Sequence, residues 1–259
     1  MDRCDFLPVS AEEMHERGWW WYDALVVGGD AYVDHPSFGT AVISRVLEAE
    51  GLRVAVLAQP DWHDAEAFRA MGRPRLGVFI GAGNLDSMVA HYTAAKRRRS
   101  EDFYSPGKRT GCRPDRAAIV YCNRAREAFG PDVPIILGSL EASLRRFAHY
   151  DYWDDSVRRA ILFDAPADLL VYGMGEAATI EIAHRLKKKQ SVHTMTDIPG
   201  TGYITRDPSV CKFDHITLPS FEDVRDDKRL YAEATRTEYA EHDPVRGRAM
   251  IQPCEGRYL

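Results

Sequence analysis

The sequence lacks the close cysteine groups that hold metal ions and clusters. Its five cysteines, Cys4, Cys112, Cys122, Cys211 and Cys254, are scattered, and the nearest two are ten residues apart. Structural zinc sites usually use C-x-x-C, and radical SAM clusters use C-x-x-x-C-x-x-C, because one loop must wrap the metal with several thiolates. Neither motif occurs, so no metal site is predicted within the chain and the thiols are expected to be free.

Long apolar runs are also missing. No window approaches 18 consecutive apolar residues, and the first twenty residues mix charged with apolar side chains, unlike a signal peptide. A cytoplasmic protein without a membrane span is therefore expected. The formal charge of -5 gives no general attraction to nucleic acid, so a nucleic acid partner is not predicted. The hydrophobic fraction of 45% is nevertheless enough for a substantial core.

Strand-like apolar runs alternate with helical patterns from Asp23 onward. The predicted strands are 24–27, 53–58, 76–80, 133–137 and 168–172, and the predicted helices between and after them are 38–50, 114–129 and 176–189. Such alternation is typical of βαβ units. The predicted fold class is therefore α/β and Rossmann-like, with a mostly parallel sheet flanked by helices.

Four of the predicted strands run into glycine turns, at Gly28, Gly81, Gly138 and Gly173. Ligands of open α/β sheets bind beyond the carboxyl ends of the strands, where glycine lets the backbone approach a ligand and helix N-termini offer free N–H groups. A site for a small-molecule ligand is therefore expected in these loops. The candidate pocket residues are Asp30, Asp34, His35, Gly39, Glu141, Arg145, Arg146 and Glu176.

These candidates also have structural interpretations. His35 could hydrogen-bond within its own loop, or it could line a pocket with Asp30 and Asp34. The charged run at 141–146 could be an ordinary helix before a half-buried turn. Alternatively, one of its two arginines could pair with an anionic group through its planar guanidinium. The sequence leaves both alternatives open.

Residues 82–113 interrupt the alternation as a basic, partly helical insertion. Its cluster of cations at 96–99 is expected to be a solvated surface, because the chain overall is acidic. Contact with RNA through 96–109 is the weaker alternative, and it would weaken steeply with salt.

The C-terminal part has a different pattern. Residues 220–241 are predicted as one exposed helix that begins with a capping box of Ser220 and Asp223. The chain ends on two large apolar side chains without a polar tail, which is typical of a polypeptide that continues. The predicted domains are a Rossmann-like domain over 1–206 and a helical linker over 207–259.

Other ligand motifs are incomplete. After the third predicted strand, Asp86 stands where a dinucleotide fingerprint needs its third glycine. A metallophosphoesterase would need a histidine where Leu85 stands. A cobalamin domain that supplies a histidine to cobalt uses D-x-H-x-x-G after its first strand, but in the loop at 34–39 the histidine directly follows the aspartate. None of these three sites is therefore predicted.

Several ordered strings together resemble the N-terminal region of the YgiQ family of radical SAM proteins. They are GDAYVDHPSFG at 29–39, QPDW at 59–62, AGNLDSM at 82–88, RPDRA at 113–117, LGSLEASLRR at 137–146, HYDYW at 149–153 and YGMGE at 172–176. The likeness covers nearly the whole chain. More distantly, the strand-end turns resemble the cobalamin-binding-type domain that precedes many radical SAM barrels, although Ser139 stands where glycine is more usual.

The resemblance implies a Rossmann-like front domain followed by a radical SAM barrel of the same polypeptide. In that barrel, three cysteines would hold a [4Fe-4S] cluster and leave one iron open for S-adenosylmethionine. These 259 residues contain no such motif, so no cofactor is predicted within the chain, and catalysis by the chain alone is not expected. Cobalamin is not among the expected cofactors, and any cobalamin that bound would lack a histidine below its cobalt.

Two hypotheses follow. The first is the N-terminal portion of a radical SAM enzyme, with the barrel as its partner. The alternative is a freestanding Rossmann-like module that binds a nucleotide or a corrinoid. A downstream cysteine triad in the polypeptide would favour the first, whereas ligand binding by an isolated domain would favour the second.

Overall fold

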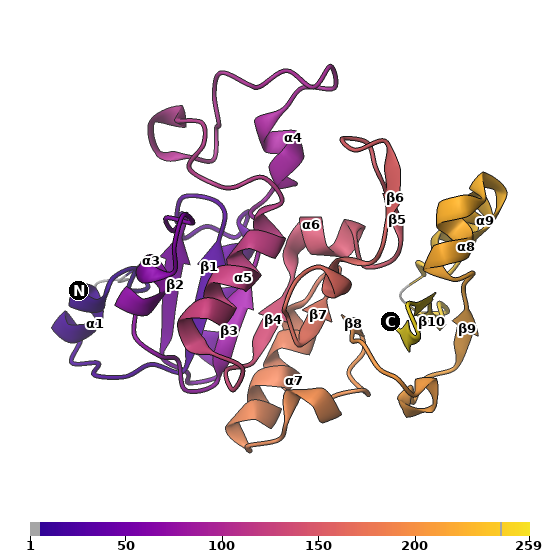
Figure 1. Ribbon diagram of the computed structural model, residues 1–259. Helices are drawn as coiled ribbons and strands as arrows, with labels where there is room; N and C mark the ends of the chain where they lie inside the picture. Colours follow the sequence, from indigo (N-terminus) through magenta and orange to yellow (C-terminus); the bar gives the residue numbers. More distant parts are fainter. Residues whose placement is uncertain (1–5, 244) are drawn as a thin grey trace.

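The computed structural model describes residues 6–243 and 245–259, and a six-stranded sheet forms its centre (Figure 1). The strand order is β2-β1-β3-β4-β7-β8, and all neighbours are parallel except β7 and β8. The strands are β1 (Ala24–Gly28), β2 (Val54–Ala58), β3 (Gly77–Ile80), β4 (Ile135–Leu137), β7 (Leu169–Val171) and β8 (Thr201–Gly202). The predicted α/β fold with a mostly parallel sheet is confirmed.

Helices cover both faces of the sheet. They are α2 (Gly39–Ala49) and α7 (Glu176–Lys187) on one face, and α3 (Glu66–Ala70) and α5 (Ala117–Phe129) on the other. Leu47 and Ile182 are buried in the first core, and Phe68 and Tyr121 in the second. Successive side chains of β1 and β3 enter opposite cores, as the two-residue period of a strand requires.

The helix ends follow local sequence signals. Gly51 (φ 76°) and Gly130 (φ 77°) adopt the left-handed conformation just after α2 and α5, where glycine carries no steric cost. The remaining short elements are α1 (Ala11–Glu16), α6 (Ser139–Leu144), η2 (Ile161–Phe163) and η3 (Val192–Thr194). The helices predicted over 38–50, 114–129 and 176–189 agree with α2, α5 and α7 to within about one turn.

The basic insertion between β3 and α5 contains α4 (Ser87–His91) and the 3₁₀ turn η1 (Pro106–Lys108). It rises beyond the strands at the top of Figure 1, close to the hairpin of β5 (His149–Asp151) and β6 (Ser156–Arg158). The two protrusions touch, because Lys96 Nζ donates to the carbonyl of Trp153 at 2.8 Å.

The chain after β8 forms an extension of mixed structure. It consists of η4 (Pro208–Val210), β9 (His215–Thr217), α8 (Phe221–Asp226), α9 (Lys228–Ala240), β10 (Ala249–Ile251), β11 (Pro253–Cys254) and β12 (Arg257–Tyr258). The capping box of Ser220 and Asp223 is confirmed. The single helix predicted over 220–241 is wrong, because Asp227 is extended (φ -127°) and caps a second helix. The extension is also not purely helical, since β9 pairs with β10 and β11 with β12.

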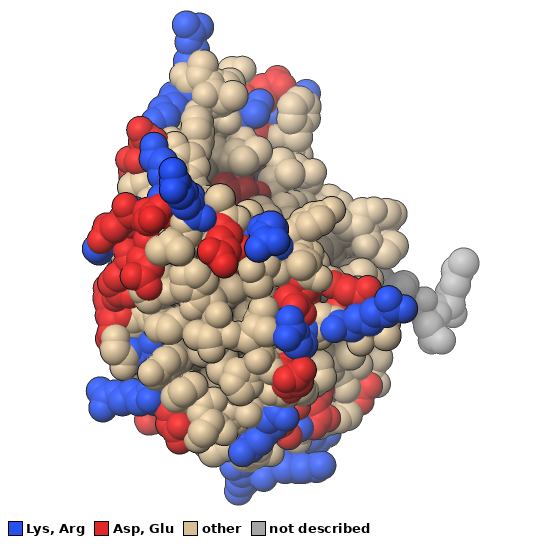
Figure 2. Space-filling view, turned by 90° about the vertical axis from the view of Figure 1, so that its right-hand side faces the viewer, with Lys and Arg blue, Asp and Glu red and all other residues tan. Residues whose placement is uncertain are grey.

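The extension packs against the stem of the β5–β6 hairpin. Phe221, Val224 and Ala234 form a small core with Ala148. Gln252 reinforces this contact, because its Oε1 accepts from the amide of Ala148 at 2.7 Å. Figure 2 shows the face of the molecule that carries the extension, where a broad uncharged area lies between side chains of both signs. A domain boundary at residue 206 stays a prediction.

Candidate functional site

A cavity of about 320 Å³ lies at the carboxyl ends of the parallel strands, beside the first turns of α2 and α7. We call it the strand-end cavity. Its apolar wall includes Val26, Phe79, Ile136 and Val171 from β1, β3, β4 and β7. Its polar lining comes from Thr40, Asn84, Ser139, Glu176 and Thr179. This is the edge of the sheet at which the sequence predicts a site, and ligand binding there stays a prediction.

Thr179 is one of the polar residues of this wall whose side chain can still form a hydrogen bond. The residue is 2% exposed, and its hydroxyl has no partner among residues 6–243 and 245–259. Asn84 differs, because its Nδ2 donates to the carbonyl of Ser37 and its Oδ1 accepts from the amide of Gly39. The hydroxyl oxygen can both donate and accept a hydrogen bond. A polar atom of a ligand in the cavity would find a hydrogen-bonding partner there.

Ser139 shapes the turn after β4. Its φ of 74° lies in the left-handed region, which explains why glycine suits this position better. Its Oγ accepts a hydrogen bond from the amide of Ala82 at 3.1 Å. The serine therefore joins the turns after β3 and β4 on the floor of the strand-end cavity.

The structure does not bring all eight predicted pocket residues together. Gly39 and Glu176 line the strand-end cavity, and Arg146 lines a second cavity beside the extension. The remaining five residues line neither cavity. Four of them make buried or half-buried structural contacts instead.

Asp30 does not line the pocket, in contrast to the expectation from sequence. Its carboxylate accepts from the amide of Asn84 at 2.7 Å and lies 2.9 Å from Nη1 of Arg113. Arg113 is fully buried and also makes two hydrogen bonds of 3.1 Å to Asp102. Burial raises the pKa of Asp30, while Asn84 and Arg113 act in the opposite direction. Asp30 therefore anchors the insertion to the end of β1.

Asp34 and His35 also have local partners. Asp34 forms an ion pair with Arg45 of α2, and its two carboxylate oxygens accept hydrogen bonds from Arg45 Nε at 3.0 and 3.2 Å. His35 is exposed, and its Nδ1 accepts from the amide of Ser37 at 3.1 Å. Asp34 thus pairs with the neighbouring helix α2 and His35 with its own loop, and, like Asp30, neither side chain lines the strand-end cavity.

Glu141 and Arg145 hold the other end of the insertion. Glu141 is buried and accepts from the amides of Ser87 at 2.8 Å and Ala118 at 3.1 Å. Arg145 forms an ion pair with Asp86, the N-cap of α4. Burial raises the pKa of the Glu141 carboxyl, and the nearby Asp86 raises it further. Neither residue is free to face a ligand in the strand-end cavity.

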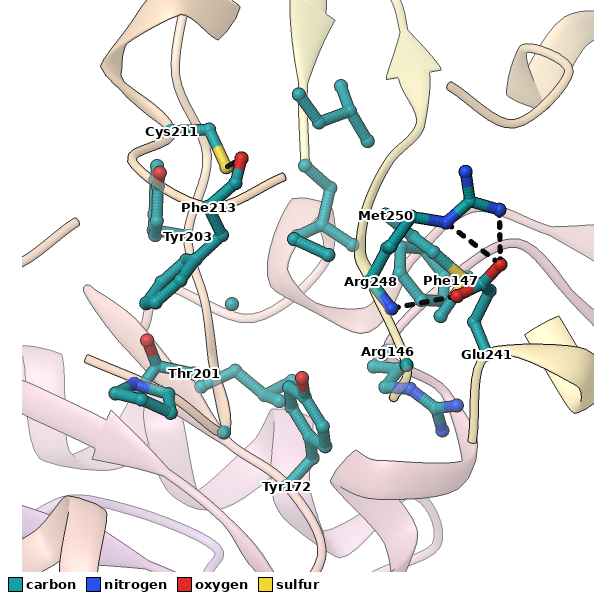
Figure 3. Close-up of a pocket in the computed structure, with 18 of the residues that line it drawn as sticks. Arg146, Phe147, Tyr172, Thr201, Tyr203, Cys211, Phe213, Glu241, Arg248 and Met250 are labelled. Carbon is teal, nitrogen blue, oxygen red and sulfur yellow. Dashed lines mark hydrogen bonds and ion pairs between the residues drawn. The ribbon is translucent and has the colours of Figure 1, made fainter. Parts of the chain in front are cut away.

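A second cavity, of about 740 Å³, lies between the ends of β7 and β8 and the extension. We call it the extension cavity. Figure 3 shows the rings of Tyr172, Tyr203 and Phe213 on one side and the ion pair of Arg248 with Glu241 on the other. Most of its wall is apolar, so it is suited to an apolar occupant.

Arg146 lies at the edge of the extension cavity with its guanidinium engaged. Its Nη1 donates to the carbonyl of Ser143 at 2.7 Å, and its Nη2 lies 2.7 Å from Nε2 of His242. Glu238 of α9 is 4.0 Å from the same guanidinium, and burial raises the pKa of Glu238 to about 7. Arg146 thus joins α6 to the extension.

Sequence reasoning missed several residues of this region. Arg113 and Asp102 stand in a polar, basic segment, and no local pattern marks them as buried. Thr179 could have been found from its helical spacing of three residues from Glu176, which places both on one side of α7. The extension cavity had no sequence signal, because its walls come from segments far apart in the chain.

No resident metal site is visible in this part of the polypeptide. Among residues 6–243 and 245–259, no three His, Cys, Asp or Glu side chains come together as a metal-binding group. Cys112, Cys122, Cys211 and Cys254 are free thiols, as predicted, and Cys4 lies outside the described residues. The described helices include none that is both long and apolar enough to cross a membrane.

Comparison with solved structures finds the radical S-adenosylmethionine methyltransferase TsrM from Kitasatospora setae, which was solved with cobalamin and a [4Fe-4S] cluster bound. The match has a TM-score of 0.45 and 19% sequence identity, and covers 72% of this chain and 27% of that chain. At this similarity the comparison adds nothing about the ligands of this chain.

Curated relatives are much closer in sequence and much longer. A UPF0313 protein of Clostridium botulinum strain 657 / Type Ba4 is 52% identical over all 259 residues, which span 40% of that relative. A UPF0313 protein of Clostridium perfringens strain SM101 / Type A is also 52% identical, and the chain spans 39% of it. The family described as Radical SAM N-terminal matches residues 6–259. The chain therefore belongs to the radical SAM N-terminal family and corresponds to one region of a longer radical SAM family protein.

Proposed function

We propose that this chain is the N-terminal domain of a radical SAM enzyme, in which a following barrel binds a [4Fe-4S] cluster and S-adenosylmethionine. The observation that carries the proposal is the family match over residues 6–259 in a chain that spans 40% of its C. botulinum relative. The described residues bring no cluster ligands together. The three cysteines that a radical SAM cluster requires would therefore come from the rest of the polypeptide.

Cobalamin does not fit a histidine-ligated site in this domain. Among the described residues, those that line the strand-end cavity include no histidine. His35, the histidine nearest in sequence to the end of β1, is exposed and accepts a hydrogen bond from its own loop. We therefore include no step that depends on cobalamin.

The test uses the full-length protein, purified without oxygen and reconstituted with iron and sulfide. We expect about four irons per chain. With S-adenosylmethionine and dithionite added as the electron donor, we expect reductive cleavage to methionine and 5′-deoxyadenosine. The matched control replaces the three cysteines of the downstream C-x-x-x-C-x-x-C with alanine. Full-length protein that binds no iron, or whose iron content is unchanged in the control, would contradict the proposal.

The strand-end cavity favours a second candidate function, the binding of a nucleotide or a corrinoid without chemistry. Its place at the carboxyl ends of the strands and the unpartnered hydroxyl of Thr179 support this role for a nucleotide, whereas a corrinoid is much larger than the volume of about 320 Å³ and would have to lie mostly outside the cavity. Binding of ATP and of hydroxocobalamin to the cluster-free full-length protein can be measured by equilibrium dialysis. The variant Thr179→Phe would fill the cavity and abolish binding, while Thr235→Phe at an exposed position would not. Equal affinities of both variants would exclude the cavity as the site.

A further inference from the structure

Helix α6 exposes apolar side chains at the carboxyl end of the sheet. Leu140 and Leu144 lie one turn apart and are both exposed, Leu144 at 60%, while Glu141 and Ala142 of the same helix are buried. Two exposed leucines on one side of a six-residue helix do nothing for the stability of the described fold. Grouped exposed apolar residues mark surfaces that another molecule or domain covers.

The apolar surface extends onto the turn between β7 and α7. The amide of Gly173 donates to Ser143 Oγ at 3.2 Å, so this turn is held against α6. The next residue, Met174, is 88% exposed, although it begins the connection between a buried strand and a well-packed helix. Leu144 and Met174 thus belong to neighbouring elements that a direct hydrogen bond ties together.

Helix α4 is also held against α6 and carries a further exposed apolar side chain. The ion pair of Asp86 with Arg145 and the hydrogen bond from Ser87 to Glu141 hold α4 against α6. Val89 of α4 is exposed. We call Val89, Leu140, Leu144 and Met174 together the strand-end apolar surface.

Both cavities adjoin this surface. Met174 lines the strand-end cavity and the extension cavity, so the β7–α7 turn forms the ridge between them. Tyr258 and Leu259 line the extension cavity, and Leu259 is held there by two hydrogen bonds with the backbone of Gln252 at 3.0 and 3.1 Å. A polypeptide that continues from Leu259 therefore starts beside the ridge.

We propose that the part of the polypeptide that follows Leu259 docks on the strand-end apolar surface and covers the mouths of both cavities. The chain spans only 40% of its C. botulinum relative, so the longer protein contains enough additional polypeptide to form such a domain. Docking would bury four apolar side chains and place the strand-end cavity at the domain interface, where small-molecule sites commonly lie. The inference rests on the proposed function only in requiring a downstream domain, and it does not depend on that domain's chemistry.

The test is hydroxyl-radical footprinting of the full-length protein, with oxidation rates measured by mass spectrometry and normalised to the unfolded protein. Met174, Leu140 and Leu144 are expected to oxidise about tenfold more slowly than their exposure in this domain predicts, because a packed interface excludes solvent. Trp20 is the internal control. It is 80% exposed and lies before the start of β1, at the opposite edge of the sheet.

A matched pair of variants tests the cause of the protection. Leu144→Asp in the full-length protein should restore oxidation of Met174, whereas Trp20→Asp should leave it slow. If Met174 oxidises in the full-length protein as fast as Trp20 after normalisation, the proposal is wrong. Protection that disappears on dilution to a monomer would assign the surface to a second copy and would also overturn it. Protection in a protein that binds no iron would uphold the docking while refuting the proposed radical SAM chemistry.

Discussion

The guanidinium of Arg113 lies 2.9 Å from the carboxylate of Asp30, and both side chains are buried. Arg113 also binds Asp102 through two hydrogen bonds. One arginine at the end of the insertion therefore joins the carboxyl end of β1 to the middle of the insertion. The carboxylate of Asp30, which a sequence motif suggests as a ligand, serves here as a structural partner.

Replacing Arg113 should destabilise the protein strongly. Arg113→Ala would leave two buried carboxylates without their counter-ion, at a cost of about 3–5 kcal/mol in the free energy of unfolding. Urea denaturation followed by tryptophan fluorescence would measure the change. The exposed Arg109→Ala in the same insertion should change stability by less than about 0.5 kcal/mol. Equal stability of the two variants would show that the buried ion pairs do not hold the insertion.

Two glycines on either side of the same loop should differ sharply in their tolerance of alanine. A Cβ at Gly29 would lie 2.0 Å from the carbonyl oxygen of Ala82, whereas a Cβ at Gly39 would meet nothing within 4 Å. We expect Gly29→Ala to cost about 3 kcal/mol by overpacking. Gly39→Ala, at the start of α2, should be neutral or stabilising. Thermal denaturation of both variants checks this, and a tolerated Gly29→Ala would contradict the close approach of the two loops.

Gln252 should control how firmly the extension is attached. Its side chain accepts from the amide of Ala148 and donates to the carbonyl of Pro219, and the residue is buried. Gln252→Ala would leave both backbone groups unpaired, at a cost of about 1–3 kcal/mol. We expect faster hydrogen exchange in the strands β9 and β10. Unchanged exchange there would show that the apolar contacts of α8 alone hold the extension.

The half-buried carboxyl of Glu238 predicts a specific dependence of stability on pH. Burial raises its pKa from 4.5 to about 7, so between these values the folded protein retains a proton that the unfolded chain has lost. The part of the folding stability that depends on this proton is therefore fully present below pH 4.5 and is lost as the pH rises through about 7. Glu238→Gln should raise stability at pH 8 by about 1–3 kcal/mol relative to the unmodified protein.

Urea denaturation at pH 5 and pH 8 would test this prediction. The exposed Glu233→Gln on the same helix is the control and should show the same pH dependence as the unmodified protein. If Glu238→Gln and the control show the same change in stability between pH 5 and pH 8, the carboxyl of Glu238 is not significantly desolvated in the folded protein.

The amino-acid order predicts the main elements of the sheet well. The strands β1, β2, β3, β4 and β7 are marked by apolar runs, because buried parallel strands contact helices on both faces. The antiparallel strand β8 was not predicted, since two residues carry no periodic signal. The extension was only partly predicted. No feature of the local sequence distinguishes Asp227, where α8 ends and α9 begins, from a polar residue inside one long helix.

The sequence by itself determined the α/β class, the parallel sheet, the glycine turns at its carboxyl edge and the resemblance to radical SAM proteins. These features depend on local periodicity and on ordered motifs. Only the tertiary structure decided which charged residues pair. Asp30, Glu141 and Arg145 follow strands, as candidate ligand residues do, but their partners lie in the insertion. Such pairing depends on which distant segments the fold brings together, and no local pattern encodes that.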